Sequence, residues 1–393
     1  MTTAGRAPGR VRVGGVELAY RDEGPRRAPV LVLTGSLGTT HEMWDEQAEA
    51  LRGRFRVVRF DTRGHGASGA PAGPWSVADL GGDLLGLLDA LGVAHASLCG
   101  LSLGGMVALW VASHAPGRVD RLVLACSAPE LGPPSPWLER AASVRASGTS
   151  SLLSTLTSRW FTPAFAPRGA AVLARVGSML ASCSDEGYAS CCEAIASTDL
   201  SGDVPSVRAP TLVLAGSSDP VAPPARALAL AGSLPDASLT VIAGAAHLAN
   251  LEQPAAFTAA VRAHLEGDLA SAGGSRRRAV LGDSHVTAAL ARSAPWGDGF
   301  QDLVTRYAWG ELWGSDALDT RTRSAVTIAL LAAGGRREEL VLHLAAASRN
   351  GLDREEVAEV LRHVAVYAGL PAANAAFSAA GEAWSADAEP GAP

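Results

Sequence analysis

Residues 96–113, ASLCGLSLGGMVALWVAS, decide the fold. The apolar run Ala96–Leu101 is typical of a buried strand, and Gly105–Ser113 has the pattern of a helix. Between them, Gly100-Leu101-Ser102-Leu103-Gly104 matches G-x-S-x-G, a tight strand–turn–helix connection that holds a serine hydroxyl clear of the sheet. Glycine at both flanks avoids clashes in such a turn. The stretch predicts an α/β protein in which Ser102 is a nucleophile.

Short β-rich runs alternate with helical patterns on both sides of this stretch, over residues 11–265. Several runs are continuous Val/Leu segments, as expected for strands buried on both faces of a mostly parallel sheet. The predicted strands are Pro29–Thr34, Arg56–Phe60, Ala96–Leu101, Arg121–Ser127, Thr211–Ala215 and Ser238–Ile242. Residues 130–203 show helical patterns and no strand pattern, which predicts a helical lid over the carboxyl edge of the sheet.

A second domain of another class follows. Residues 266–278 read EGDLASAGGSRRR, a polar segment rich in Gly, Ser and Arg that predicts a linker. Residues 279–385 carry helical patterns and no strand signal, so we expect a separate all-helical domain. Two domains of different class indicate two activities, or one activity and an assembly module.

Composition excludes several classes of function. All 33 positively charged residues are Arg, so a lysine Schiff base and a phosphate-binding P-loop are both excluded. A net charge of −6 argues against a nucleic-acid or anionic-membrane partner. The 5 Cys form no C-x-x-C pair, so neither a zinc site nor a disulfide framework is indicated. With no apolar run of about 20 residues and no secretory signal pattern, we expect a cytoplasmic protein without bound metal.

Candidate partners for Ser102 follow two later strands. Asp219 comes after Thr211–Ala215, and His247 comes after Ser238–Ile242. The order Ser, acid, His, with each residue on a loop after a strand, is that of the α/β-hydrolase triad. His247 would take the Ser102 proton, and Asp219 would orient the imidazole. The oxyanion donors are expected to be the backbone N–H groups of Leu103 and Leu37.

Residues 11–265 resemble the 3-oxoadipate enol-lactonase branch of the α/β-hydrolases. The stretches that carry the resemblance are LTGSLGTTHEMWD, RFDTRGHGAS, CGLSLGGMVALW, RWFTPAF and AHLANLEQP. Members of this family open an enol-lactone ring by attack on the lactone carbonyl. The resemblance implies an acyl-Ser102 intermediate, and it leaves open direct attack by a water molecule that His247 activates.

The C-terminal domain resembles 4-carboxymuconolactone decarboxylase, through FQDLVTRYAWGELW, LDTRTRSAVTIALLAA and VAVYAGLPAANAAF. The resemblance implies loss of CO2 from a carboxylated unsaturated lactone, whose own carbonyl accepts the electron pair, so that no cofactor is required. It also implies homo-oligomers formed through this domain. The two reactions are consecutive in the β-ketoadipate route of protocatechuate catabolism, which predicts a bifunctional enzyme that acts on small lactones.

Candidate residues for decarboxylation follow from helical spacing. Leu303, Tyr307 and Glu311 are four residues apart, which places Glu311 on an apolar stripe, either buried in a site or solvated at its edge. His343 lies in an apolar helix, where a buried core histidine is the alternative to a catalytic one. Three arginines are weaker candidates for binding substrate carboxylates, and surface ion pairs are their alternative: Arg306, Arg321 and Arg323.

Two other functions compete with the bifunctional interpretation. One is a single-activity serine esterase or lactonase whose C-terminal helical domain only drives oligomerisation. The other is a general esterase or cofactor-free haloperoxidase, since the triad motifs alone fit any such hydrolase. A carbon dioxide assay distinguishes the first from a bifunctional enzyme, and a preference for simple esters distinguishes the second.

Overall fold

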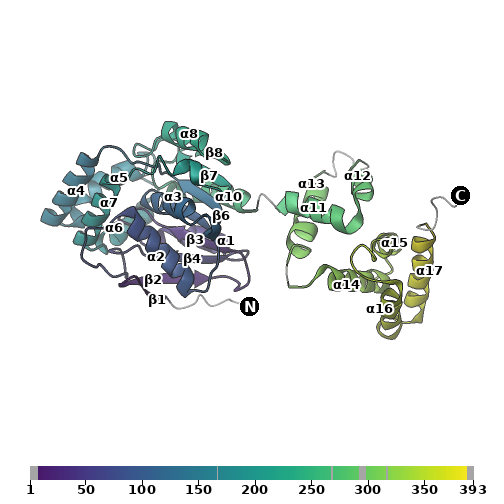
Figure 1. Ribbon diagram of the computed structural model, residues 1–393. Helices are drawn as coiled ribbons and strands as arrows, with labels where there is room; N and C mark the ends of the chain where they lie inside the picture. Colours follow the sequence, from purple (N-terminus) through teal and green to yellow (C-terminus); the bar gives the residue numbers. More distant parts are fainter. Residues whose placement is uncertain (1–7, 166, 267–268, 292–297, 316, 387–393) are drawn as a thin grey trace. The chain divides into compact units, whose positions relative to one another are not determined.

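A computed structural model describes residues 8–386 apart from 166, 267–268, 292–297 and 316. The chain divides into two compact units, Met1–Leu265 and Glu266–Pro393. Each unit has its own hydrophobic core among the described residues. Figure 1 shows the sheet in the first unit and only helices in the second. The predicted fold class, a mostly parallel α/β sheet followed by an all-helical region, is confirmed.

The first unit is built on an eight-stranded sheet of order β1-β2-β4-β3-β5-β6-β7-β8. The β1–β2 and β2–β4 pairs are antiparallel, and all later pairs are parallel. Every residue of β4, β5 and β7 is buried, as expected for strands covered on both faces. The strands are β1 Gly9–Val13, β2 Val16–Glu23, β3 Val30–Thr34, β4 Arg56–Phe60, β5 Ala96–Leu101, β6 Val119–Ala125, β7 Thr211–Gly216 and β8 Ala237–Ile242.

Helices flank this sheet, and a further group of helices forms the segment predicted as a lid, called the lid below. The helices that follow or flank the strands are η1 His41–Trp44, α1 Asp45–Leu51, α2 Val77–Ala90, α3 Leu103–His114, η2 Pro116–Arg118, η4 Val204–Ser206, α8 Pro224–Ser233, α9 Ala249–Glu252 and α10 Pro254–Glu266. The lid lies between β6 and β7, and Figure 1 shows its helices gathered at one end of the unit. It comprises α4 Pro134–Ser147, η3 Thr149–Leu152, α5 Leu153–Trp160, α6 Ala170–Ala181 and α7 Asp185–Ala196.

The second unit contains helices alone within its described residues. They are α11 Leu269–Leu281, α12 Asp283–Ala291, α13 Asp298–Val304, the π-helix η6 Thr305–Leu312, α14 Thr320–Ala333, α15 Arg337–Ala345, α16 Arg354–Tyr367 and α17 Leu370–Ala386. Its core comes from α14 to α17, with Ile328, Val357 and Leu361 fully buried. A capping box between Asp353 and Glu356 starts α16.

The structure differs from the predicted linker at residues 266–278. Residues 269–281 form α11, which packs against η6. Gly273 explains the difference, because a Cβ at this position would lie 2.1 Å from the Thr305 carbonyl oxygen. The glycine therefore allows two helices to approach closely. In the sequence, the same glycine contributes to the Gly-rich composition that predicts a flexible linker.

The segment that carries Leu303, Tyr307 and Glu311 does not form one regular α-helix. The helix α13 ends at Val304, and a π-helix continues to Leu312. A π-helix forms i→i+5 hydrogen bonds, so residues four apart no longer share one stripe. Leu303 and Tyr307 are 53% and 62% exposed in this segment.

Among the described residues, no helix has both the length and the apolar character needed to cross a membrane.

Candidate active site

The turn that carries Ser102 has a strained backbone. Ser102 lies between β5 and α3 with φ +57° and ψ −117°. Residues other than glycine rarely adopt a positive φ, and such backbone strain is concentrated at functional sites. The flanking glycines permit this turn, because a Cβ on Gly104 would lie 2.2 Å from the Thr34 carbonyl oxygen and one on Gly100 would lie 2.1 Å from the Gly104 carbonyl oxygen. The hydroxyl is therefore held at the carboxyl end of the sheet.

Ser102, His247 and Asp219 form a continuous line of hydrogen bonds. The His247 Nε2 atom lies 2.9 Å from Ser102 Oγ, and His247 Nδ1 lies 2.9 Å from Asp219 Oδ2. Because a carboxylate only accepts hydrogen bonds, the His247 proton lies on Nδ1, and Nε2 is free to accept the serine proton. The three residues are at most 4% exposed.

The Asp219 carboxylate is held in its charged form. Burial by itself would raise the pKa of this carboxyl, but the charge and hydrogen bond of His247 outweigh burial and lower the pKa. Backbone N–H groups of Val221 and Ala222 donate to Asp219 Oδ1 at 2.7 and 3.1 Å, and they act in the same direction. Asp219 is therefore an ionised, oriented partner for an imidazolium at His247.

Leu103 and Leu37, the predicted oxyanion donors, come from the start of α3 and from the loop after β3. Leu103 is the first residue of α3, so its N–H group has no acceptor within the helix. Leu37 lines the same pocket as Ser102 and His247. The next N–H group, that of Gly38, donates to His65 Nε2 at 3.0 Å, and burial lowers the pKa of His65 and keeps it neutral. His65 therefore holds the loop of Leu37, a role that the sequence did not indicate.

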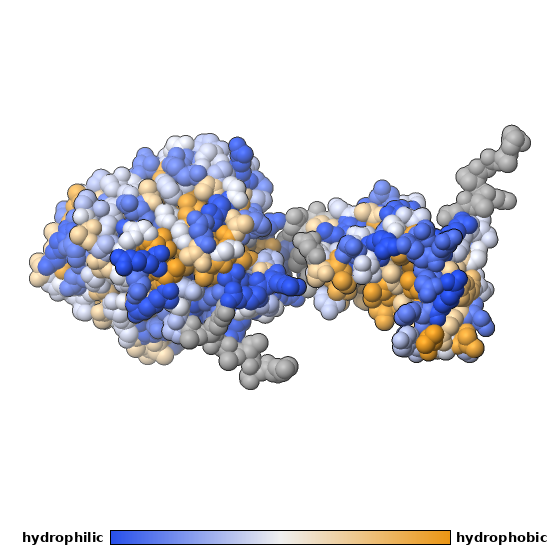
Figure 2. All heavy atoms as spheres, turned by 60° about the horizontal axis from the view of Figure 1, so that its bottom comes forward, coloured by the Kyte–Doolittle hydropathy of each residue, from blue (hydrophilic) through white to orange (hydrophobic). Residues whose placement is uncertain are grey.

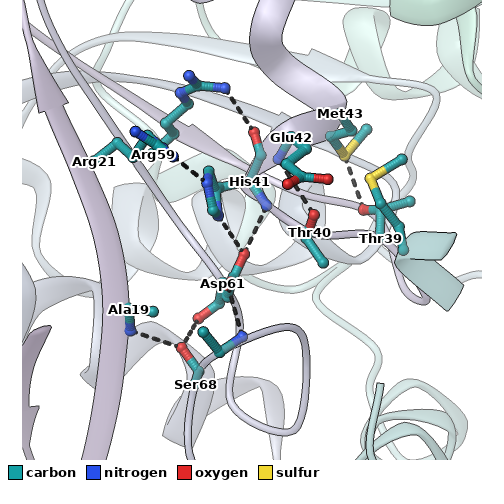
Figure 3. Close-up of polar contacts among 12 residues, drawn as sticks. Ala19, Arg21, Thr39, Thr40, His41, Glu42, Met43, Arg59, Asp61 and Ser68 are labelled. Atoms are coloured by element: carbon teal, nitrogen blue, oxygen red, sulfur yellow. Dashed lines mark hydrogen bonds and ion pairs between the residues drawn. The ribbon is translucent and has the colours of Figure 1, made fainter. Parts of the chain in front are cut away.

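A buried carboxylate anchors the rest of that loop (Figure 3). Asp61 Oδ1 accepts the His41 backbone N–H at 2.7 Å and lies 2.8 Å from His41 Nδ1. Its second oxygen accepts the Ala67 N–H at 3.0 Å. On the far side of the ring, Arg21 Nε donates to His41 Nε2 at 3.1 Å. Asp61 is therefore fully used in joining the loop after β3 to the loop after β4, which favours a structural role over contact with substrate.

A pocket over Ser102 is lined by lid residues that sequence reasoning did not identify. Arg140 and Trp137 come from α4, Arg159 and Trp160 come from α5, and Tyr188 comes from α7. The Arg140 guanidinium lies 4.6 Å from the centre of a Trp137 ring. Within the described residues, neither Arg140 nor Arg159 has a carboxylate partner. The pocket thus offers two cationic groups to an anionic ligand beside the serine.

The second unit places His343 among aromatic rings. The His343 ring on α15 stacks on Trp309 at 6.5 Å and on Trp313 at 6.2 Å between ring centres. Its Nδ1 atom is buried and has no hydrogen-bond partner within the described part of the chain. Burial, together with the charge of His285, lowers the pKa of His343 to about 4. The free protein therefore holds a neutral imidazole with an unused nitrogen at this site.

The other predicted residues of the second unit are not shown to join His343. Glu311 is part of η6, and its side chain lies outside the described residues. Arg321 is exposed and pairs with Glu356, while Arg323 is buried and donates to the carbonyl oxygens of Ser315 and Leu318. Both arginines thus take part in polar contacts within the second unit, and their binding of substrate carboxylates stays a prediction. Arg306 is exposed.

Comparisons with known proteins agree with the two units. Residues 28–254 match the model of the alpha/beta hydrolase fold, and residues 298–382 match that of the carboxymuconolactone decarboxylase family. The chain is 39% identical over 248 residues to 3-oxoadipate enol-lactonase 2 of Acinetobacter baylyi, a match that spans 63% of this chain and 92% of the relative. It is also 45% identical over 106 residues to 4-carboxymuconolactone decarboxylase of the same organism, a match that spans 27% of this chain and 79% of the relative.

A solved structure supports the first of these matches. The enol-lactonase of Burkholderia xenovorans LB400 aligns with a TM-score of 0.64 and 40% sequence identity, over 65% of this chain and 99% of that chain. The resemblance found in the sequence to both families is therefore confirmed.

The neutral state of His343 predicts a pH dependence of stability. Between pH 6.5 and 4.5 an unfolded chain protonates this histidine, whereas the folded chain, with a pKa of about 4, does not. The free energy of unfolding of the second unit therefore falls as the pH falls, and His343 accounts for about 2 kcal/mol of the loss. His343→Leu is expected to remove that part of the slope in denaturant titrations at the two pH values. An identical slope in the variant would contradict a neutral His343.

Proposed function

We propose that this chain, which belongs to the alpha/beta hydrolase family and in its C-terminal unit to the carboxymuconolactone decarboxylase family, catalyses two consecutive reactions. The second unit decarboxylates 4-carboxymuconolactone to 3-oxoadipate enol-lactone, and the first unit hydrolyses that lactone to 3-oxoadipate, as in the β-ketoadipate route. The observation that carries the proposal is the hydrogen-bonded line of Ser102, His247 and Asp219 beneath a pocket with two arginines.

The geometry supports hydrolysis through an acyl-enzyme. His247 Nε2 takes the proton of Ser102 as the serine oxygen attacks the lactone carbonyl. The N–H groups of Leu37 and Leu103 bind the oxygen that becomes negative. The ester bond then breaks, and the ring oxygen leaves as an enol that takes the proton from His247 and tautomerises to the ketone. Water, activated by the same histidine, releases 3-oxoadipate from Ser102.

The arginines of the pocket explain a preference for an anionic lactone. The enol-lactone carries a carboxylate on a short side chain, and charge-assisted hydrogen bonds from guanidinium groups are strong, specific contacts for carboxylates. Arg140 and Arg159 are half-buried, which strengthens such contacts by limiting water. This arrangement favours the lactone over the simple neutral esters that a general esterase prefers.

His343 is the proposed acid–base group of the decarboxylase reaction. Loss of CO2 leaves an electron pair that delocalises onto the lactone carbonyl, and the product forms when a proton reaches the α-carbon. The unused Nδ1 of His343 lies in an aromatic environment that excludes water. Binding of a substrate carboxylate favours the imidazolium form, which then supplies the proton. Trp309 and Trp313 would form the walls of this site.

We also propose that the second unit forms homo-oligomers. Figure 2 shows hydrophobic residues exposed on the visible face of this unit. Four strongly exposed apolar side chains are Leu330, Val366, Tyr367 and Leu370, with exposures of 68%, 77%, 81% and 70%. Exposed apolar patches mark contact surfaces between proteins.

Sedimentation velocity tests the oligomer directly. The full chain is expected to sediment as a species larger than its 40.1 kDa monomer. The paired change Val366→Asp and Leu370→Asp is expected to shift it towards the monomer, since a charge at a buried contact loses its hydration. A wild-type chain that is monomeric at micromolar concentration would contradict the proposal.

Single changes separate the two reactions. With 4-carboxymuconolactone as substrate, Ser102→Ala is expected to lower hydrolysis of the enol-lactone by about 10⁴-fold or more while CO2 release continues. His343→Ala is expected to stop CO2 release and leave hydrolysis of added enol-lactone intact. Carbon dioxide and 3-oxoadipate are measured together, on the full chain. Loss of both reactions in Ser102→Ala would contradict two separate sites, and CO2 release by His343→Ala would return His343 to a core residue.

The substrate preference is tested at the arginines. Arg140→Gln and Arg159→Gln are each expected to raise KM for the enol-lactone by about tenfold or more, because each removes a charge-assisted hydrogen bond. Hydrolysis of neutral p-nitrophenyl acetate is expected to stay unchanged. Arg226→Gln, which removes a guanidinium bound to the Glu130 carbonyl oxygen, is the control. An equal loss on both substrates would show that the arginines support the fold and not the choice of substrate.

A further inference from the structure

Glu252 is a buried carboxylate whose donors come from two distant segments. It lies at the end of α9 and is 4% exposed. Its Oε2 atom accepts the Ala246 N–H at 2.8 Å. The Thr162 N–H lies 3.1 and 3.2 Å from its two carboxylate oxygens, and the Thr162 hydroxyl donates to Oε1. Burying a carboxylate is costly unless such donors satisfy it, so its position is fixed by both segments together.

These two segments have different tasks in the proposed hydrolysis. Ala246 precedes His247, the proposed base, in the loop after β8. Thr162 belongs to the lid, two residues beyond Trp160, which lines the pocket over Ser102 with Arg159. Glu252 thus joins the segment that follows the pocket residue Trp160 to the loop that carries His247.

A second contact joins the same segments on the other side of His247. The Leu248 N–H donates to the Trp160 carbonyl oxygen at 3.0 Å. The N–H groups of Ala246 and Leu248, the residues on either side of His247, are therefore both bonded to the lid segment 160–162, the first through Glu252 and the second directly. A shift of this lid segment moves the backbone that carries the imidazole.

We propose that Glu252 is a positioning residue that holds the lid segment 160–162 against the loop of His247. Through this contact it keeps Trp160 in the pocket wall and keeps His247 within hydrogen-bond distance of Ser102. This inference rests on the proposed function of Ser102 and His247. The hydrogen bonds of Glu252 described above reach neither Ser102 nor a residue of the substrate pocket. Glu252 therefore acts on the site through Ala246 and Thr162. Displacement of a catalytic group by about 1 Å is enough to lower a rate by about 100-fold, so such a lock has a measurable effect.

The test uses a probe that reacts with Ser102 without the lactone. Diethyl p-nitrophenyl phosphate phosphorylates an activated serine: the Ser102 oxygen bonds to phosphorus, p-nitrophenolate leaves, and His247 takes the serine proton. The rate of p-nitrophenolate release reports the Ser102–His247 pair in the full chain. Values of kcat and KM for the enol-lactone and the thermal midpoint are measured alongside.

Glu252→Gln is expected to lower the phosphorylation rate constant and kcat together, by about tenfold or more. The amide NH2 group of the glutamine is a donor, and it would face a group of Thr162 or Ala246 that donated to the carboxylate. Thr162→Val is expected to lower both by a smaller factor, since it keeps the backbone N–H. The double variant is expected to be no slower than Glu252→Gln alone. Gln253→Ala is the matched control: its side chain bonds Gly244 in the same loop and has no lid contact among its described hydrogen bonds.

The outcomes separate this inference from the proposed function. A lower thermal midpoint, with both rates unchanged in folded Glu252→Gln and Thr162→Val, would reduce Glu252 to a structural residue and overturn the inference alone. An equal loss in Gln253→Ala would overturn it as well, since the lid contact would then be irrelevant. A wild-type chain that leaves Ser102 unmodified would overturn the proposed triad, and the inference with it.

Discussion

The geometry of the first unit depends on the close approach of α3 to the edge of the sheet at Ser102. The backbone can turn through the left-handed region there only because Gly100 and Gly104 leave no side chain between strand, turn and helix. That approach places the start of α3 beside the loop after β3, whose residue Leu37 lines the pocket over Ser102. The position of Ser102 then sets where His247 and its partner Asp219 must lie.

Polar groups buried around this turn hold the loops in place. Asp61 and His65 fix the loop after β3, and Glu252 fixes the loop after β8. Each of these side chains accepts hydrogen bonds from backbone N–H groups, and these bonds fix the position of the loop. The lid takes part in these contacts at Thr162, whose N–H group donates to Glu252.

The extent to which the sequence predicts this structure differs between the two units. Buried strands leave continuous apolar runs, so the sequence predicts β3 to β7 and the fold class, and the G-x-S-x-G motif marks Ser102. Arg140 and Arg159 were not predicted, because lid helices leave no periodic signal that tells a pocket residue from a surface one. Glu252 left a faint signal, a carboxylate within an otherwise apolar stretch. The π-helix at Thr305–Leu312 and the helix at Leu269–Leu281 were missed, since local composition does not report i→i+5 bonding or the close contact at Gly273.

The presence of both units on one polypeptide has a consequence for metabolic flux. Synthesis of the chain supplies the two sites in equal number, whatever the level of expression. Under the proposed function, the steady-state level of the enol-lactone between the two reactions is then set by the ratio of their kinetic constants, and regulation of the gene leaves that ratio unchanged. A cell that increases this protein raises the capacity of both steps in parallel and does not accumulate a labile intermediate through unequal dosage.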